Sequence, residues 1–213
     1  MDAPGASAKK SVWIGTNPLV LASRSATRLA MLASAGLPGE VVPADIDERA
    51  FEEQYLARGE PLETLASALA QAKALGASAV RPDAYCIGAD QTLMLGPQLL
   101  HKPSSLAEAA ETLTALSNQT HRLTSAFSVA LAGETLATDA DEARLTMRTL
   151  SRDEIACYLD LAGPAAMSSV GAYQIEGVGM HLFERVDGDH WTILGLPMLK
   201  LLAWLRGQGL LTL

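Results

Sequence analysis

Asp90 and Gln91 stand side by side inside an otherwise apolar stretch, CIGADQTL at residues 86–93. Because apolar residues flank the pair, both polar side chains are expected near a hydrophobic core, where a buried strand ends. A carboxylate at a strand end is a frequent position for chemistry in α/β proteins. The alternative is a turn-forming aspartate without chemistry, which is the commoner role of a lone Asp.

A second candidate site is the segment SRSATR, which joins a predicted strand over 19–23 to a predicted helix over 26–35. The first turn of a helix leaves backbone N–H groups unpaired, and these can bind phosphate. The hydroxyls of Ser23 and Ser25 could donate to the same oxygens, and Arg28 could bind two of them. Alternatively, Ser25 only caps the helix and Arg28 is a surface charge. The segment taken alone favours that alternative.

Two lysines could add positive charge to such a site. Lys73 falls within the apolar stripe of a helix predicted to begin at Pro61, so it must either extend past its neighbours to solvent or reach a polar cleft. Lys102 follows Asp90 after the short excursion LMLGPQLLH, which fits a strand that returns towards the carboxylate. An exposed turn lysine is the alternative for Lys102, and by itself the favoured one.

Carboxylates could also hold a metal ion. Asp45, Asp47 and Glu48 in PADIDE could supply oxygen ligands, although an acidic turn in solvent is the alternative. His121 begins a predicted strand and has no Cys or second His at ligand spacing, so it is expected to be a structural histidine or one that supports other site residues, and not a zinc ligand.

The elements that must position these residues alternate between strand and helix. Strands or extended segments are predicted over 19–23, 41–48, 85–95 with a break at Asp90, 121–131 and 141–150 (the last two as a hairpin), and around a turn within 170–191. Helices are predicted over 26–35, 61–78, 106–116, 154–161 and 196–205. Capping boxes are predicted at Ser105 with Glu108 and at Ser151 with Glu154. This alternation without repeats favours one bilobed α/β domain over 19–213, preceded by a loose leader over 1–18.

Composition excludes several functional classes. With 213 residues and a net charge of −8, the chain lacks the basic stripe that general nucleic-acid binding requires. A polyanion would therefore be bound by a few placed cations, helped by a metal. No apolar segment is long enough to cross a membrane and no signal peptide is evident, so a cytoplasmic protein is expected. Cys86 and Cys157 lie outside redox and metal spacings and are expected to be buried thiols.

Several segments occur in one order along the chain: LASRSATRLAML, PADIDE, LASALAQAKA, GADQTL, HKP, LSNQTHRLTSAFSVAL, VGAYQIEGVGMHLFERVDGD and LGLP. This series resembles the Maf family of nucleoside triphosphate pyrophosphatases over residues 19–205. The resemblance implies an α/β fold with a long mixed sheet, helices on both sides and two lobes around a cleft. It also implies hydrolysis of non-standard nucleoside triphosphates to monophosphate and pyrophosphate, a divalent metal (Mg²⁺ or Mn²⁺) and a homodimer.

The resemblance assigns roles to individual residues. Asp90 matches the catalytic acid, Lys73 and Lys102 match the two catalytic lysines, and Glu48 matches the acid that shares the metal with Asp90. The motif that binds the phosphates is matched by Ser23, Ser25 and Arg28.

Departures from the family pattern concern the base. The pattern SxSPRR is altered at Ala26 and Thr27, Gln91 stands where Thr is usual, and Glu176 stands where pyrimidine-preferring members have Gln. Gln91 and Glu176 are the positions at which the chain resembles the branch that prefers 7-methyl-GTP. A buried carboxylate at Glu176 would suit guanine, because it can accept from two N–H groups of that base. Gln91 is expected to read the base or to support its pocket. That branch has Trp at the position of Thr27, so the choice of base stays open.

The rival class is a regulatory protein of cell division, with the pocket vestigial or used as a nucleotide sensor. The altered SRSATR segment favours that class. The presence of Asp90, Lys73, Lys102 and Glu48 together weighs against it.

Overall fold

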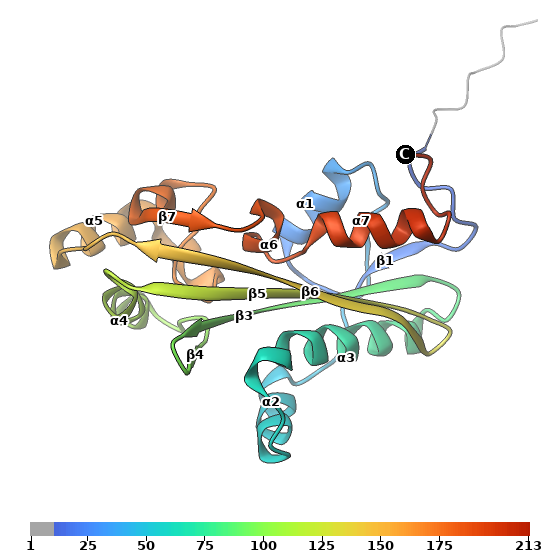
Figure 1. Cartoon of the computed structure of the whole chain (residues 1–213), viewed down its shortest axis with the longest axis horizontal. Helices are drawn as coiled ribbons and strands as arrows, with labels where there is room; N and C mark the ends of the chain where they lie inside the picture. The colour runs from blue at the N-terminus through green and yellow to red at the C-terminus, as the bar shows by residue number, and fades with distance from the viewer. Residues whose placement is uncertain (1–10) are drawn as a thin grey trace, which may run out of the picture.

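The computed structural model describes residues 11–213 and contains one mixed sheet with helices on both faces (Figure 1). The strands are β1 (Leu19–Leu21), β2 (Glu40–Val41), β3 (Tyr85–Leu95), β4 (Gln98–Leu100), β5 (Thr120–Leu131), β6 (Glu134–Met147) and β7 (Phe183–Asp187). The α-helices are α1 (Ala26–Ser34), α2 (Glu48–Ala57), α3 (Leu65–Val80), α4 (Leu106–Leu116), α5 (Arg152–Ala162), α6 (His190–Ile193) and α7 (Met198–Gly207). Shorter 3-10 helices span Leu62–Thr64, Gly163–Ser168 and Val178–Leu182.

The sheet has the strand order β2-β1-β3-β5-β6-β7, and β4 pairs with the end of β3. The strand β1 runs parallel to β2 and β3, whereas the other pairs are antiparallel. The predicted α/β fold with a long mixed sheet is therefore confirmed. The hairpin predicted from two strands after residue 120 is confirmed as β5 and β6, which are longer than expected.

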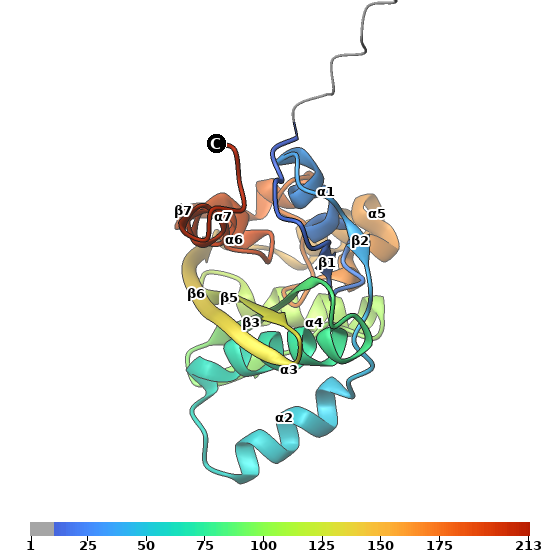
Figure 2. The same cartoon turned by 90° about the vertical axis from the view of Figure 1, so that its right-hand side faces the viewer.

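Helix α3 packs on one face of the sheet, and α1, α6 and α7 lie on the other (Figure 1). Helix α2 extends outward beyond α3 (Figure 2). Among the helices of the described residues, none has the length and apolarity that a membrane crossing needs.

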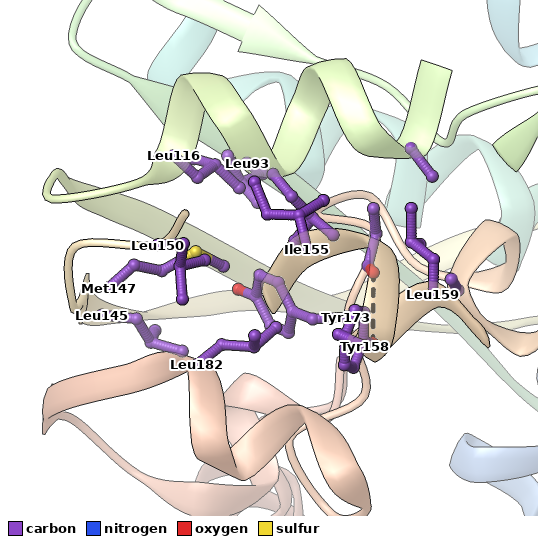
Figure 3. Close-up of a cluster of buried hydrophobic side chains, with 14 of the residues drawn as sticks. Leu93, Leu116, Leu145, Met147, Leu150, Ile155, Tyr158, Leu159, Tyr173 and Leu182 are labelled. Atoms are coloured by element: carbon purple, nitrogen blue, oxygen red, sulfur yellow. Dashed lines mark hydrogen bonds between the residues drawn. The ribbon is translucent and has the colours of Figure 1, made fainter. Parts of the chain in front are cut away.

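Strand β3 connects two hydrophobic clusters. On the face towards α1 and α7, Ile87 and Ala89 belong to one cluster and Leu93 to the other, with Gln91 between them. The second cluster also includes side chains of β6, α4 and α5 (Figure 3). On the opposite face of β3, Asp90 faces α3. Gln91 therefore lies where the two clusters meet, and Asp90 lies on the opposite side of the same strand.

The strand predicted to end at Asp90 continues to Leu95, so that prediction was wrong. The β5 ladder runs unbroken from Cys86 to Met94. The other edge of β3 is interrupted, because the β1 pairing stops at Ile87 and the β4 pairing starts at Leu93. Asp90 thus lies in a gap on one side of a rigid strand.

Other local predictions also need correction. Helix α2 was missed, although Asp47 caps it by accepting from the Ala50 N–H. Within 170–191 only β7 is a strand. The Ser105 hydroxyl accepts from the Glu108 N–H, but the Glu108 carboxylate accepts from Ser104, so no reciprocal box forms there.

The box at Ser151 and Glu154 has both hydrogen bonds and is confirmed. Cys86 is buried as predicted, whereas Cys157 is exposed because it lies on the outer side of α5.

The predicted leader falls partly outside the described residues, which begin at residue 11. Trp13 forms a β-bridge with Leu211, and the Ile14 N–H donates to the Leu210 carbonyl at 3.0 Å. The Trp13 ring also packs edge-on against Tyr85. Residues 11–17 are therefore attached to the C-terminal end of the chain and to the sheet.

Candidate active site

A pocket of about 770 Å³ opens beside the gap in β3. All ten predicted site residues line it: Ser23, Ser25, Thr27, Arg28, Glu48, Lys73, Asp90, Gln91, Lys102 and Glu176. These residues come from six separate parts of the chain, so their convergence is a property of the fold and not of any local motif.

Lys73 forms the centre of the charged part of the pocket. Its Nζ lies 2.6 Å from Asp90 Oδ1 and 2.8 Å from Glu48 Oε1. The side chains of Lys73 and Asp90 are only 10% and 9% exposed, whereas Glu48 is 59% exposed. Of the two possible positions predicted for Lys73, the structure shows the polar cleft.

The electrostatics of Asp90 follow from this burial. Burial raises the pKa of the Asp90 carboxyl above its ordinary value, because the charged form loses its hydration. The charges of Lys73 and Arg28 oppose that increase in the pKa. Asp90 Oδ2 accepts no hydrogen bond from any described residue and is available to a ligand.

The close contact between Lys73 and Asp90 depends on a glycine. A Cβ atom added to Gly88 would lie 2.5 Å from the Ala74 nitrogen and still closer to the Ala70 carbonyl oxygen. Only glycine lets the α3 backbone come so near to β3. Gly88 and Asp90 point to the same face of β3, so this approach brings Lys73 to the carboxylate.

Arg28 is largely committed to the protein itself. Its Nε donates to the Gly195 carbonyl at 2.7 Å, and its Nη1 donates to the Ala89 carbonyl at 2.8 Å and to Ser23 Oγ at 3.1 Å. Burial lowers the pKa of Arg28, and Asp90 and Glu48 raise it. Because Nε and Nη1 are occupied, the predicted two-pronged grip on a phosphate is not available without rearrangement, and Nη2 is the group left for a ligand.

Ser25 is the N-cap of α1, accepting from the Arg28 N–H at 3.3 Å. The predicted cap and the predicted phosphate seat are compatible, because the remaining N–H groups of this first turn stay at the pocket. Ser23 Oγ accepts from the Ser25 N–H, and its own proton can still be donated to a ligand.

Gln91 holds α6 against the sheet. Its Nε2 lies 2.9 Å from the Ile193 carbonyl, 3.1 Å from the Thr192 carbonyl and 3.0 Å from Ser125 Oγ. The Ser125 hydroxyl donates to the same Thr192 carbonyl at 2.6 Å. Of the two predicted roles, reading the base or supporting the pocket, this geometry favours support.

The remaining predicted residues lie at the mouth of the pocket. Lys102 is exposed and follows β4, which returns beside β3 as expected, but it makes no ion pair with Asp90. Glu176, which we expected to be buried, is exposed because it lies in an irregular segment before the 3-10 helix Val178–Leu182. Thr27 is half-buried in the first turn of α1.

Two cations of the lining were missed by sequence reasoning, Arg24 and Arg49. Neither forms an ion pair with any residue in 11–213. Arg24 lies in the segment SRSATR and Arg49 directly follows Glu48, so adjacency to assigned residues was the available signal. The lining holds five of the 16 Lys and Arg side chains and four carboxylates, Glu48, Glu52, Asp90 and Glu176, so cations make up a larger share of its charged groups than they do in the acidic chain as a whole.

The donor set is compatible with a shared divalent cation. Within 11–213 no cluster of three or more His, Cys, Asp or Glu side chains could hold a metal alone. Asp90 and Glu48 nevertheless converge on a single cationic nitrogen, Lys73 Nζ. Mg²⁺ is often held by one or two carboxylates together with substrate phosphates and water, and this pair fits that pattern.

Comparison with known proteins places the chain among close relatives. A family model described as "Maf-like protein" matches residues 18–208. A protein of Nitrobacter winogradskyi named "Nucleoside triphosphate pyrophosphatase" is 50% identical over 206 residues, covering 95% of this chain and 100% of the relative. A Rhodopseudomonas palustris protein of the same name is 49% identical over 203 residues, covering 94% and 98%. A Rhizobium etli protein named "7-methyl-GTP pyrophosphatase" is 49% identical over 194 residues, covering 91% and 98%.

Proposed function

Because the chain belongs to the Maf-like protein family, we propose that it hydrolyses nucleoside triphosphates to the monophosphate and pyrophosphate. The observation that carries the proposal is Lys73 Nζ in contact with both Asp90 and Glu48 inside a pocket rich in cations. Names of relatives at about 50% identity agree with this activity, and the regulatory alternative is not favoured.

Asp90 acts as the general base in the proposed mechanism. Its free Oδ2 accepts a proton from a water molecule whose oxygen attacks the α-phosphorus. The bond between that phosphorus and the bridging oxygen breaks, and pyrophosphate leaves with the bonding electrons. Lys73 holds Oδ1 and thereby orients the carboxylate. Burial keeps the carboxylate more basic than a solvated one, which favours proton transfer.

The cations and the α1 N-terminus bind the triphosphate. Lys73, Lys102 and the Nη2 group of Arg28 neutralise charge as the phosphoanhydride breaks, and Ser23 and Ser25 position the phosphates. Carboxylate oxygens of Asp90 and Glu48 would hold a Mg²⁺ or Mn²⁺ ion, which would withdraw charge from the phosphate oxygens.

For the base, we propose a preference for guanine nucleotides, including 7-methyl-GTP, over UTP and dTTP. Glu176 can accept from the N1–H and the exocyclic amine of guanine, whereas a pyrimidine carbonyl would face it as a second acceptor. Because Glu176 is exposed in the free protein, a bound base must bury it for this discrimination to act. Glu176→Gln is expected to narrow the ratio of kcat/KM between 7-methyl-GTP and UTP, and an unchanged ratio would contradict the assignment.

The reaction is tested by incubating the protein with a nucleotide panel and Mg²⁺ in ¹⁸O-labelled water. Attack at the α-phosphorus places the label in the monophosphate, as measured by mass spectrometry. Label in pyrophosphate, or release of orthophosphate, would contradict the proposal. Asp90→Asn keeps the shape of the side chain and should lower kcat by at least about 10²-fold with the fold intact.

We also propose that the protein is a cytoplasmic homodimer, as the family resemblance implies. Light scattering coupled to size exclusion tests the dimer, and a monomer mass at micromolar concentration would contradict it.

A further inference from the structure

One part of the pocket wall carries no charge. It is formed by the segment 168–175, whose lining residues are Ser168, Ser169, Val170, Gly171, Tyr173, Gln174 and Ile175. The charged lining residues come mainly from the β1–α1 connection, α2, α3, β3 and the stretch after β4. A triphosphate is expected against the charged part, which leaves the uncharged segment to contact the nucleobase.

Regular secondary structure does not fix most of this segment, which must therefore be held by side chains. Ala172 adopts a left-handed backbone with φ of 60°, a conformation that needs support from its surroundings. The Tyr158 hydroxyl donates to the Ala172 carbonyl at 3.2 Å (Figure 3). The Ser169 hydroxyl accepts from the Tyr173 N–H at 3.0 Å and donates to the Tyr173 carbonyl.

The deepest support comes from His121 on β5. Its Nε2 lies 2.7 Å from the Tyr173 hydroxyl, and the residue is 1% exposed. The Tyr173 ring also packs edge-on against Phe183, with centroids 4.8 Å apart. Figure 3 shows Tyr173 surrounded by Leu182 and other aliphatic side chains of this cluster.

The buried pair of His121 and Tyr173 stabilises the fold less than apolar side chains would. His121 Nδ1 is buried and has no hydrogen-bond partner among the described residues. Burial lowers the pKa of His121 to about 4, so the imidazole is neutral at neutral pH. Apolar side chains of similar size would fill this space without an unpaired nitrogen. The hydrogen bond between His121 and Tyr173, however, fixes the position and the orientation of the Tyr173 side chain, because a hydrogen bond has a preferred length and direction. Apolar packing imposes no such direction.

We propose that His121 is a positioning residue for nucleotide binding, whose contact with the Tyr173 hydroxyl fixes the segment 168–175 in the conformation that accepts the nucleobase. The proposal rests on the proposed function. His121 itself does not line the pocket and acts through Tyr173, which does.

The test separates positioning from stability with a double-mutant cycle. Tyr173→Phe leaves His121 with both nitrogens unpaired, so Tm should fall and KM should rise about three- to tenfold, the value of one lost hydrogen bond. The turnover number should change less, because Asp90 and Lys73 are untouched. In the double variant His121→Leu with Tyr173→Phe, both polar groups are gone and Tm should recover. KM should stay raised, because the directional contact is still missing.

A KM that returns to the wild-type value together with Tm would overturn the proposal, because the pair would then only stabilise the core. Tyr55→Phe is the control, since it removes the hydroxyl of another buried tyrosine, which bonds to Thr64 at 2.6 Å in a partly buried contact outside the pocket. It should lower Tm and leave KM unchanged.

Binding of α,β-methylene-GTP, measured by calorimetry, makes the outcome independent of catalysis. The variants should weaken this binding by the same factor by which they raise KM. If the wild type binds the analogue but hydrolyses no nucleotide, the proposed function fails and the positioning role stands. If the wild type does not bind it, both fail.

Discussion

At the scale of single residues, Lys73 supplies the positive charge that pairs with both carboxylates of the site in the absence of substrate. One ammonium group balances a buried carboxylate, Asp90, and an exposed one, Glu48. Removing one partner of a buried ion pair is usually far more costly than the pair's net contribution, because the other charge stays buried. An apolar substitution at Lys73 is therefore not the neutral change that a lysine on a helix surface would allow.

Lys73→Met is predicted to destabilise the protein at pH 8 by up to about 3–5 kcal/mol. Loss of the ammonium group raises the pKa of Asp90 further. A group whose pKa is higher in the folded state loses stabilising effect as the pH rises through that value, so the penalty should shrink at pH 5. Urea unfolding of the wild type and of Lys73→Met at pH 8 and at pH 5 measures the loss of unfolding free energy. Lys73→Met combined with Asp90→Asn should recover stability but not activity, and an equal penalty at both pH values would count against this account.

Metal removal should separate activity from stability. Asp90 and Glu48 alone make an incomplete ligand set, and the described residues contain no larger cluster. We therefore expect chelation with EDTA to abolish hydrolysis, MgCl₂ to restore it, and Tm to stay within about 1 °C, because a metal bound through the substrate stabilises little without it. A large drop in Tm on chelation would indicate a metal held by the protein alone.

At the scale of elements, the distance between α3 and β3 determines whether Lys73 can contact Asp90. Gly88 faces Ala70 and Ala74 of α3, and all three are small. Any side chain at residue 88 must push the helix that carries Lys73 away from the strand that carries Asp90.

Gly88→Ala should lower stability by several kcal/mol and reduce kcat/KM by at least about tenfold, because overpacking distorts the backbone at the site. Gly207→Ala is the control, since nothing lies within 4 Å of its added Cβ and it lies at the end of α7. It should leave both quantities unchanged. Wild-type activity in Gly88→Ala would mean that α3 can move without effect on the Lys73 contact.

Local periodicity explains which parts of the site were predictable. The helical stripe placed Lys73 in the buried face of α3, and the structure shows it there. Whether β3 ends at Asp90 depends on β1, β4 and β5, so a local pattern could not decide it. The partners of Arg28 and Gln91 near residues 192–195 are distant in sequence, and only the assembled fold reveals that these two side chains hold α6 and the turn after it. Helix α2 escaped detection because only Tyr55 of its residues is buried.

At the scale of the whole molecule, His121 should make the fold sensitive to acid. Its pKa is about 4 in the folded state against 6.5 as a model value, so the unfolded chain binds the proton more readily. The contribution of neutral His121 to the free energy of unfolding is then fully present above pH 6.5. It decreases as the pH falls towards 4, by about 3 kcal/mol in total. Urea midpoints between pH 7.5 and 4.5 measure the slope. His121→Leu should remove most of it, and an unchanged slope would assign the acid sensitivity to other groups.

The attachment of residues 11–17 to the C-terminal end has a consequence for the topology of the polypeptide. The Thr212 N–H donates to the Val12 carbonyl at 3.0 Å, so the two ends of the described chain lie side by side. A short Gly-Ser linker could join them, and the chain could be opened instead at Gly59, which is exposed and has free space around it. We expect such a circular permutant to fold and to keep its activity, because every strand pairing is preserved and Gly59 does not line the pocket. Folding would then depend on which elements pack together and not on which element stands at the N-terminus.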